Sequence, residues 1–156
     1  MSKLDKIDRH ILKILLQNGR LSNAKLAERI NLSPAATHKR LRRLENLAYI
    51  DGYGAQINLA KLGYKLMCYV NISLQTHASE ELKNFRDALR QMPEVLECSF
   101  VTGEFDYLAK VALRDQRHLE QFILEKITAI RGVVRVTTSL IVADIKTMPS
   151  PSILDL

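Results

Sequence analysis

The sequence has 156 residues, a hydrophobic fraction of 47% and a formal net charge of +6. It contains no apolar run near the ~20 residues of a membrane helix, and its charged start, MSKLDKIDRHILKILL, lacks the apolar region of a signal peptide. These features exclude a membrane-spanning chain and predict a cytoplasmic protein of one ordinary domain or two small ones.

The excess positive charge lies in the N-terminal part of the chain. Residues 1–60 contain 11 Lys or Arg and 5 Asp or Glu, whereas residues 61–156 contain 12 of each. A basic part followed by a neutral part indicates that the first meets a polyanion and that the second has another task. The two cysteines, Cys68 and Cys98, lie in strand-like segments, and we expect both thiols to be buried and reduced.

Three helices are predicted at the start of the chain. Residues 5–17 place apolar side chains at helical spacing, and the Asn-Gly pair that follows stops the helix. A second short helix covers residues 23–30, with Ser22 as its N-cap. The third begins at Ser33, a suitable N-cap, and Pro34 falls at the first helical position, where its missing N–H costs nothing. Two short helices joined by a tight turn form a helix-turn-helix.

The third helix, in the segment SPAATHKRLRRLE, is strongly basic. On a helical wheel with Leu41 facing inward, Lys39 and Arg43 point away from the core together with two alanines. Small residues early in the helix allow close approach to a surface, and the basic ones can reach bases or phosphates. A basic helix is often only a solvated face, but the cap, the preceding short helix and the localised charge favour duplex DNA as the partner. The predicted DNA-contacting residues are Ser33, Ala35, Ala36, His38, Lys39, Arg40, Arg42 and Arg43.

The remainder of the chain reads as strands and helices. The segment YIDGYGAQIN combines strand-like residues with turn glycines, which predicts a strand or small wing. Further strands are predicted in KLMCYVNISL, VLECSFVTG, FDYLAKVAL and VVRVTTSLIVADI, and helices over residues 79–92 and from Asp115 to Gly132. The order βαββαβ is that of a ferredoxin-like sandwich with both helices on one side of the sheet. We expect a second copy to cover the open face, which carries Met67 and Tyr69.

Taken together, these segments resemble the Lrp/AsnC family of bacterial and archaeal regulators. The resemblance is carried by LDKIDRHILKILLQNGRLS, LAERINLSPAATHKRLRRLE, YIDGYGAQINLAKLGY, VTGEFDYL and GVVRVTTSLIV, which cover nearly the whole chain. We therefore expect an α+β chain in four parts. These are a winged helix-turn-helix DNA-binding domain over residues 1–50, a strand or linker over 51–63, a ferredoxin-like ligand-sensing and oligomerisation domain over 64–145, and a C-terminal tail over 146–156.

The resemblance also implies a function. Members bind duplex DNA through the first domain and an amino acid or related metabolite through the second, and they form homodimers that associate into tetramers or octamers. The implied effector site lies between dimers, where Gly103 would let the backbone approach the ligand and Asp106 would receive an α-ammonium group. The expected effector-binding residues are Val101, Thr102, Gly103, Glu104, Asp106, Thr137, Thr138 and Ser139.

Other chemistries have weaker support in the sequence. The histidines are scattered, and no phosphate loop, nucleophile elbow or paired carboxylates are visible, so we expect no metal, no cofactor and no enzymatic activity. The alternative is an RNA-binding protein that uses the ferredoxin-like sheet, because Phe105 and Tyr107 alternate on the third strand. The missing basic-glycine-aromatic pattern and the neutral charge of this domain oppose that alternative.

Overall fold

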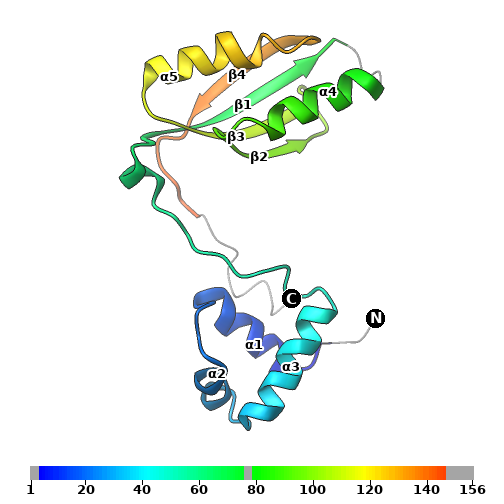
Figure 1. The fold of residues 1–156 in the computed structure, drawn as a ribbon, viewed down its shortest axis with the longest axis vertical. Helices are drawn as coiled ribbons and strands as arrows, with labels where there is room; N and C mark the ends of the chain where they lie inside the picture. The colour runs from blue at the N-terminus through cyan, green and yellow to red at the C-terminus, as the bar shows by residue number, and fades with distance from the viewer. Residues whose placement is uncertain (1–3, 76–78, 147–156) are drawn as a thin grey trace. The chain divides into compact units, whose positions relative to one another are not determined.

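The computed structural model describes residues 4–75 and 79–146, which form parts of two compact units (Figure 1). Within these ranges, the N-terminal unit comprises the chain up to Gln56 together with Lys146, and the C-terminal unit runs from Ile57 to Ile145. Among the described residues, no helix combines the length and apolar character needed to span a membrane.

The N-terminal unit confirms the three predicted helices. They are α1 (Lys6–Gln17), α2 (Asn23–Arg29) and α3 (Pro34–Asn46). Each begins at a side chain that accepts a backbone N–H three residues later: Asp5 for α1, Ser22 for α2 and Ser33 for α3. Asp5 also forms a reciprocal capping box with Asp8. At the start of each of the three helices, a backbone N–H that has no partner within the helix is therefore satisfied by a side chain close by in the sequence.

The turn between α2 and α3 is held by contacts from both helices. Asn31 adopts a positive φ of 52°, which asparagine tolerates better than most residues. The side-chain amide of Asn23 donates to the Pro34 carbonyl oxygen at 2.8 Å, which ties the start of α2 to the start of α3. Beneath the turn, the three helices share an aliphatic core. Its buried members are Ile11, Leu12, Ile14, Leu26, Ile30 and Leu44.

The predicted strand or wing after α3 is not formed within this chain. Residues 50–58 run without strand pairing, and a single 3-10 turn, η1 (Leu59–Leu62), follows. A strand needs a neighbour for its backbone groups, and the described part of the chain offers none here. Tyr53 nevertheless fastens this segment, because its hydroxyl donates to Glu45 Oε1 of α3 at 3.0 Å. Burial and the hydrogen bond to Glu45 raise the pKa of Tyr53 to about 12.

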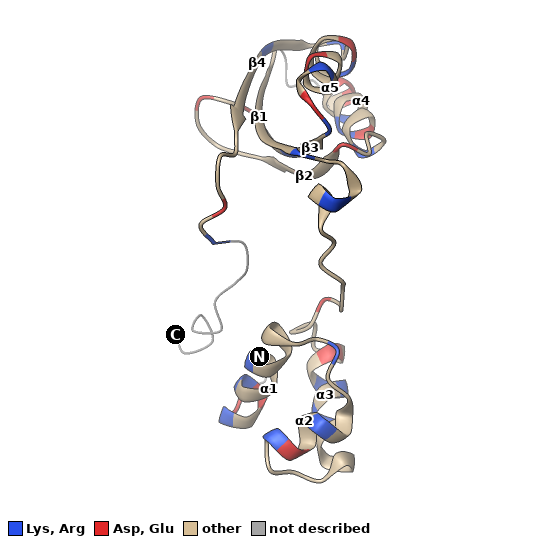
Figure 2. Cartoon of the chain, turned by 90° about the vertical axis from the view of Figure 1, so that its left-hand side faces the viewer, with Lys and Arg blue, Asp and Glu red and all other residues tan. Residues whose placement is uncertain are grey.

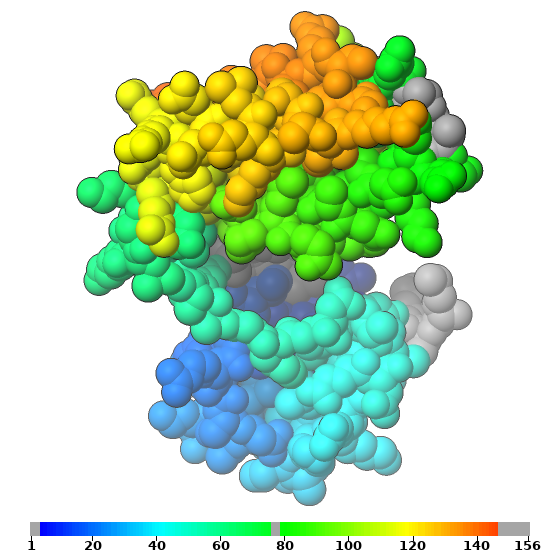
Figure 3. Space-filling view, turned by 45° about the horizontal axis from the view of Figure 1, so that its top comes forward, coloured from blue at the N-terminus to red at the C-terminus, as the bar shows by residue number. Residues whose placement is uncertain are grey.

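The C-terminal unit is the predicted βαββαβ sandwich. Its strands and helices are β1 (Leu66–Leu74), α4 (Ser79–Arg90), β2 (Val95–Phe100), β3 (Tyr107–Leu113), α5 (Gln116–Gln121) with the continuing turn η2 (Phe122–Ile127), and β4 (Val133–Leu140). The strands are antiparallel in the order β2-β3-β1-β4. Both helices lie on one side of the sheet (Figure 2). Atoms of α4 (green) and α5 (yellow) form the outer surface of that side in Figure 3.

Strand alternation divides the sheet into a buried face and a bare face. On β1, Cys68, Val70, Ile72 and Leu74 pack into the core beneath the helices. The intervening residues and their cross-strand partners therefore lie on the bare face. These are Met67, Tyr69, Asn71 and Ser73 of β1, Glu97 and Ser99 of β2, Leu108, Lys110 and Ala112 of β3, and Arg135, Thr137 and Ser139 of β4.

The second helix of the sandwich departs from the uninterrupted α-helix that the sequence predicts. It changes at Phe122 into a π-helix, with an i to i+5 bond from the Thr128 N–H to the Ile123 carbonyl oxygen. In an α-helix, Phe122 and Ile127 would point about 140° apart. The wider π turn brings both onto the core face, and both are fully buried. Packing of two bulky side chains therefore explains the change of helix type.

The prediction of two buried cysteines is half right. Both thiols are free, but Cys68 is buried and Cys98 is exposed. Cys68 lies on the central strand β1, which has neighbours on both sides. Cys98 lies on β2, an edge strand whose residues after Val95 are all exposed. Alternation alone does not distinguish a central strand from an edge.

A buried carboxylate joins β2 to the second helix. Glu94 Oε1 accepts from Lys126 Nζ and lies 3.2 Å from His118 Nε2. The Arg114 N–H donates to His118 Nδ1, so the ring proton lies on Nε2 and points to Glu94. Burial alone raises the pKa of Glu94, but its hydrogen bonds to Lys126, to the backbone and to His118 outweigh burial and hold the pKa below 4.5. Its contribution to stability is thus present above pH 4.5 and is lost as pH falls through the folded-state pKa.

Lys126→Met tests this link. We expect the free energy of unfolding in urea to fall by ~1–3 kcal/mol at neutral pH, because Glu94 stays buried with its main charged partner removed. The matched control is Lys83→Met on the exposed surface of α4, which should leave the unfolding midpoint unchanged. Equal midpoints for both variants would contradict the assignment.

Candidate DNA interface and effector site

The outer surface of α3 presents small residues first and basic residues later. Ala35 is exposed and Ala36 half-buried, while His38 and Lys39 are exposed and have no hydrogen-bond or ion-pair partner within the described part of the chain. Blue segments mark the basic residues of this helix in Figure 2. A shallow concavity of about 710 Å³ opens here, lined by Ala36, Lys39, Arg42 and neighbouring residues. This surface is free to meet a polyanion.

Two arginines predicted to contact DNA are engaged within the protein. Arg43 Nη2 donates to Asp8 Oδ2, and Arg40 Nη1 donates to Asp8 Oδ1 at 3.0 Å and to Asp5 Oδ2. Asp8 is fully buried, whereas both arginine side chains remain partly exposed. The helical wheel placed Arg43 outward with Lys39, but its guanidinium bends back to α1. The paired carboxylates therefore fix where these two cations sit on α3.

Two carboxylates and two guanidinium groups form a cluster at this point, and their hydrogen bonds shift the pKa values of two members. The members of the cluster are Asp5, Asp8, Arg40 and Arg43. A backbone hydrogen bond within the capping box and a side-chain hydrogen bond from Arg40 lower the pKa of Asp5. The hydrogen bond to Asp5 raises the pKa of Arg40. Because the folded-state pKa of Asp5 lies below 3.8, its contribution to stability is present above that pH and is lost as pH falls further. Asp5 and Arg40 are thus both charged at neutral pH.

Sequence reasoning missed the role of Asp8. A signal was present, because Asp8 precedes Ile11, Leu12 and Leu15 at helical spacing and so falls within the apolar stripe of α1. A carboxylate in an apolar stripe requires a cation from another element.

The predicted effector turn, residues 101–106, closes the β2–β3 hairpin. The Val101 N–H donates to the Asp106 carbonyl oxygen at 2.9 Å, and Asp106 Oδ2 accepts the Leu74 N–H at 2.7 Å. Asp106 therefore ties the turn to the end of β1. Gly103 has a φ of 129°, and a Cβ there would meet no atom within 4 Å. The glycine is required by the backbone conformation and not by crowding within the chain.

Arg135 connects this turn to β4. Its guanidinium lies 2.8 Å from Glu104 and 5.2 Å from the centre of the Phe105 ring. The register places Thr137 and Ser139 on the bare face, while Thr138 pairs with the buried Val70 and points to the opposite face. The structure thus brings the turn and the bare-face hydroxyls to the same side of the sheet, and it separates Thr138 from them.

The geometry does not support the RNA alternative. Tyr107 is buried beneath the helices at 2% exposure and is unavailable for stacking on a base. Phe105 lies in the turn, outside β3, beneath Arg135. Among the described residues, no group of three or more His, Cys, Asp or Glu side chains is placed to hold a metal ion.

Comparisons with known proteins cover both units. A family model described as winged helix-turn-helix DNA-binding matches residues 4–50, and one described as the Lrp/AsnC ligand binding domain matches residues 67–151. The leucine-responsive regulatory proteins of Klebsiella pneumoniae and Escherichia coli K12 are each 36% identical over 143 residues, or 92% of this chain and 87% of theirs.

Solved structures agree with these matches. A transcriptional regulator of Neisseria meningitidis in complex with L-Met aligns with a TM-score of 0.90 and 33% identity, over 95% of this chain and 96% of that one. The AsnC protein of E. coli aligns with a TM-score of 0.83 and 25% identity, over 96% and 99% of the two chains. The matched regions include both the basic helix α3 and the turn at residues 101–106.

Asp8→Asn tests the buried cluster. Replacing the carboxylate by an amide keeps its shape but removes the charge that pairs with both arginines. We expect the free energy of unfolding to fall by about 2 kcal/mol, less than for a fully buried pair because both arginines reach solvent. Urea unfolding followed by circular dichroism measures this, with Asp51→Asn at an exposed site as control. A parent-like midpoint would show that the cluster does not stabilise α3.

A pair of variants separates DNA contact from helix positioning. Lys39→Ala should weaken binding to duplex DNA and reduce the salt dependence by about one counterion, with no change in melting temperature or assembly. Arg43→Ala should also weaken binding and leave assembly intact, but with a lower melting temperature because Asp8 loses a partner. Fluorescence anisotropy at several salt concentrations and thermal melting give both quantities. If Lys39→Ala binds DNA as the parent does, this orientation of α3 is wrong.

Proposed function

The chain belongs to the Lrp/AsnC family of transcriptional regulators, and from that premise we propose that an amino acid controls how its copies assemble on duplex DNA. The observation that carries the proposal is the meeting of two exposed segments on the bare side of the sheet. Arg135 joins the turn that carries Glu104 to the strand that carries Thr137. The N-terminal unit supplies the DNA contact, and the bare face supplies the regulation.

The DNA contact is built from the start of α3. Ser33, Ala35 and Ala36 allow the helix to enter a major groove closely, with His38 and Lys39 directed to bases or phosphates. Arg42 is largely exposed, and its 3.7 Å ion pair with Glu45 leaves donors for a phosphate. Arg40 and Arg43 contact the phosphate backbone from fixed positions. Phosphate contacts supply most of the affinity, so binding weakens as salt rises.

A second copy of the chain covers the bare face. Met67, Tyr69 and Leu108 form an apolar band along its two central strands, flanked by polar residues on the edge strands. Such a band with a polar rim is typical of a protein interface. A dimer through this face presents two copies of α3, which fits half-sites one helical turn or a multiple apart. Dimers then associate into tetramers or octamers.

The effector binds where this assembly completes a concave site. In a single chain Thr102, Gly103, Glu104, Thr137 and Ser139 are all exposed. Small-molecule sites bury most of their ligand, so a turn and a strand edge this open require a second surface. The amino acid is thereby placed between protein copies, where its binding can favour one assembly over another. It does so only by binding the two states with different affinity.

The chemistry of the turn suits an α-amino acid. Asp106 was expected to receive the α-ammonium group, but its Oδ2 accepts the Leu74 N–H, so we assign that role to Glu104, whose second carboxylate oxygen lies beside its contact with Arg135. The backbone N–H groups that follow Val101 and the hydroxyls of Thr137 and Ser139 hold the α-carboxylate. Asp106 positions the turn through Leu74. Because a related regulator was solved with L-Met and other relatives are leucine-responsive, we propose an apolar amino acid of that size.

A thermal-shift screen against the proteinogenic amino acids tests the effector. A ligand of the native state at 100 times its dissociation constant stabilises by about 2.7 kcal/mol, which raises the melting temperature measurably. We expect methionine or leucine among the hits. Thr137→Val should abolish the shift, whereas the matched variant Thr138→Val, one residue away on the opposite face, should retain it. Loss in both variants, or in neither, would remove β4 from the site as described.

A further inference from the structure

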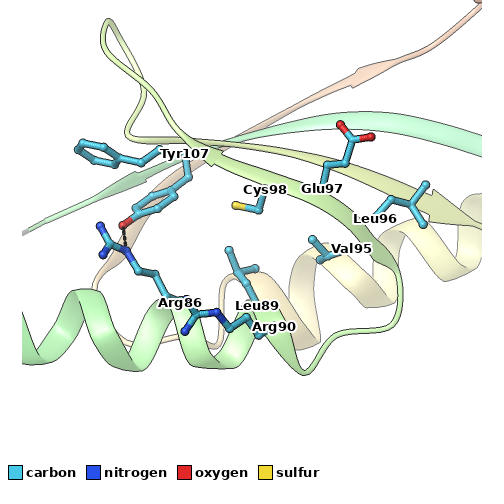
Figure 4. A pocket seen from close by; sticks show the side chains of 9 residues that line it. Arg86, Leu89, Arg90, Val95, Leu96, Glu97, Cys98 and Tyr107 are labelled. Atoms are coloured by element: carbon cyan, nitrogen blue, oxygen red, sulfur yellow. Dashed lines mark hydrogen bonds between the residues drawn. The ribbon is translucent and has the colours of Figure 1, made fainter. Parts of the chain in front are cut away.

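A groove lies between α4 and the edge strand β2 on the helix side of the sheet (Figure 4). Its cavity volume is about 400 Å³, within the range of small-molecule sites. In Figure 4, Arg86 reaches from α4 toward Tyr107, and Cys98 points from β2 toward α4. The lining residues are Arg86, Leu89, Arg90, Val95, Leu96, Glu97, Cys98, Phe100 and Tyr107.

Arg86 is held in place at this groove without a neutralising acid. Its Nε donates to the Tyr107 hydroxyl at 2.9 Å, and its guanidinium lies 5.9 Å from the ring centre of Phe100 and 5.8 Å from that of Tyr107. No carboxylate of the described residues pairs with it. The bond to the Tyr107 hydroxyl uses only one of the five N–H donors of Arg86, so the fork of its guanidinium group stays available to a carboxylate.

Two further features point to a ligand with an apolar body. Tyr107 accepts from Arg86, so its own hydroxyl proton remains available to a ligand oxygen. The side chain of Phe100 is 59% exposed although it packs on Tyr107 at 5.3 Å between ring centres. A bound apolar group would cover this exposed ring.

The remaining charges of the groove disfavour an ammonium group. Arg90 pairs with Asp87 at 2.9 Å. The carboxylate of Glu97 points away from α4, and its register partner Lys110 places it on the bare face (Figure 4). An α-ammonium group beside Arg86 would therefore meet a like charge with no facing acid.

We propose that this groove binds a small monocarboxylate with an apolar body and no neighbouring ammonium group, such as an aromatic α-keto acid. The carboxylate takes the free fork of Arg86 and the Tyr107 hydroxyl, and the apolar body packs on Phe100, Leu89 and Val95. The site is separate from the bare face and does not rest on the proposed function. Phe100 and Tyr107 are, however, the last cross-strand pair before the turn at 101–106, so a ligand here braces the base of that turn.

The exposed thiol in the groove supplies the test. Cys68 is fully buried, so iodoacetamide should alkylate Cys98 first in the native full-length protein, as mass spectrometry can show. With phenylpyruvate as the probe, we expect alkylation to slow by roughly tenfold when the probe reaches about ten times its dissociation constant. Phenylalanine, which differs in carrying the ammonium group, should protect far less.

Variants make the assignment specific. Arg86→Met should abolish protection, while Arg90→Met, on the same helix but already paired with Asp87, should keep it. Thr137→Val should also keep it, which separates this groove from the effector site on β4. The proposal is overturned if native Cys98 resists alkylation, if phenylpyruvate leaves its rate unchanged, or if phenylalanine protects equally well.

Discussion

The proposed DNA-binding surface depends on one buried carboxylate. Asp8 enters the apolar core of the N-terminal unit and pairs with Arg40 and Arg43, which fixes α3 against α1 at the end where the helix is most basic. A buried charge without partners would be costly, so the two arginines cannot leave together. Lys39 and His38 are thereby left on the outer surface. The same helix thus carries two arginines that hold its position and a lysine that is free to meet DNA.

In the C-terminal unit, the corresponding constraint is that both helices cover the same face of the four-stranded sheet and leave the other face bare. Two helices bury the helix-side residues of the central strands β1 and β3, and the other face keeps an apolar band between polar edges. In the proposed function, amino-acid sensing and assembly share a surface, because the turn at 101–106 and the exposed hydroxyls of β4 border that face. The edge strand β2 is less well covered than the central strands, and this leaves both the groove beside Arg86 and the thiol of Cys98 open.

Periodicity and capping residues predict most of this fold. Ser22 and Ser33 cap their helices as expected, the helix expected from Asp115 begins with that residue as its N-cap, and the alternation on β1 matches its burial. Local sequence patterns do not show which side chains will contact each other when they lie far apart in the sequence. The link from Asp8 to α3, the bending of Arg43 back to α1 and the π turn that buries Phe122 with Ile127 depend on neighbours far along the chain. The placement of Thr138 away from Thr137 was available from strand alternation, while the exposure of Cys98 required knowledge of which strand forms the edge.

In the proposed function, ligand binding by the C-terminal unit changes DNA binding by the N-terminal unit. A DNA duplex that the full-length protein binds is first selected from a random library. The dissociation constant for this duplex is then measured at fixed salt, with and without a saturating concentration of an amino acid that raises the melting temperature of the protein. Coupling of ~1–3 kcal/mol predicts a change in affinity of about 5- to 150-fold, or an equivalent change in the stoichiometry of the complex. An unchanged dissociation constant and stoichiometry, with the amino acid demonstrably bound, would show that the two units are not coupled.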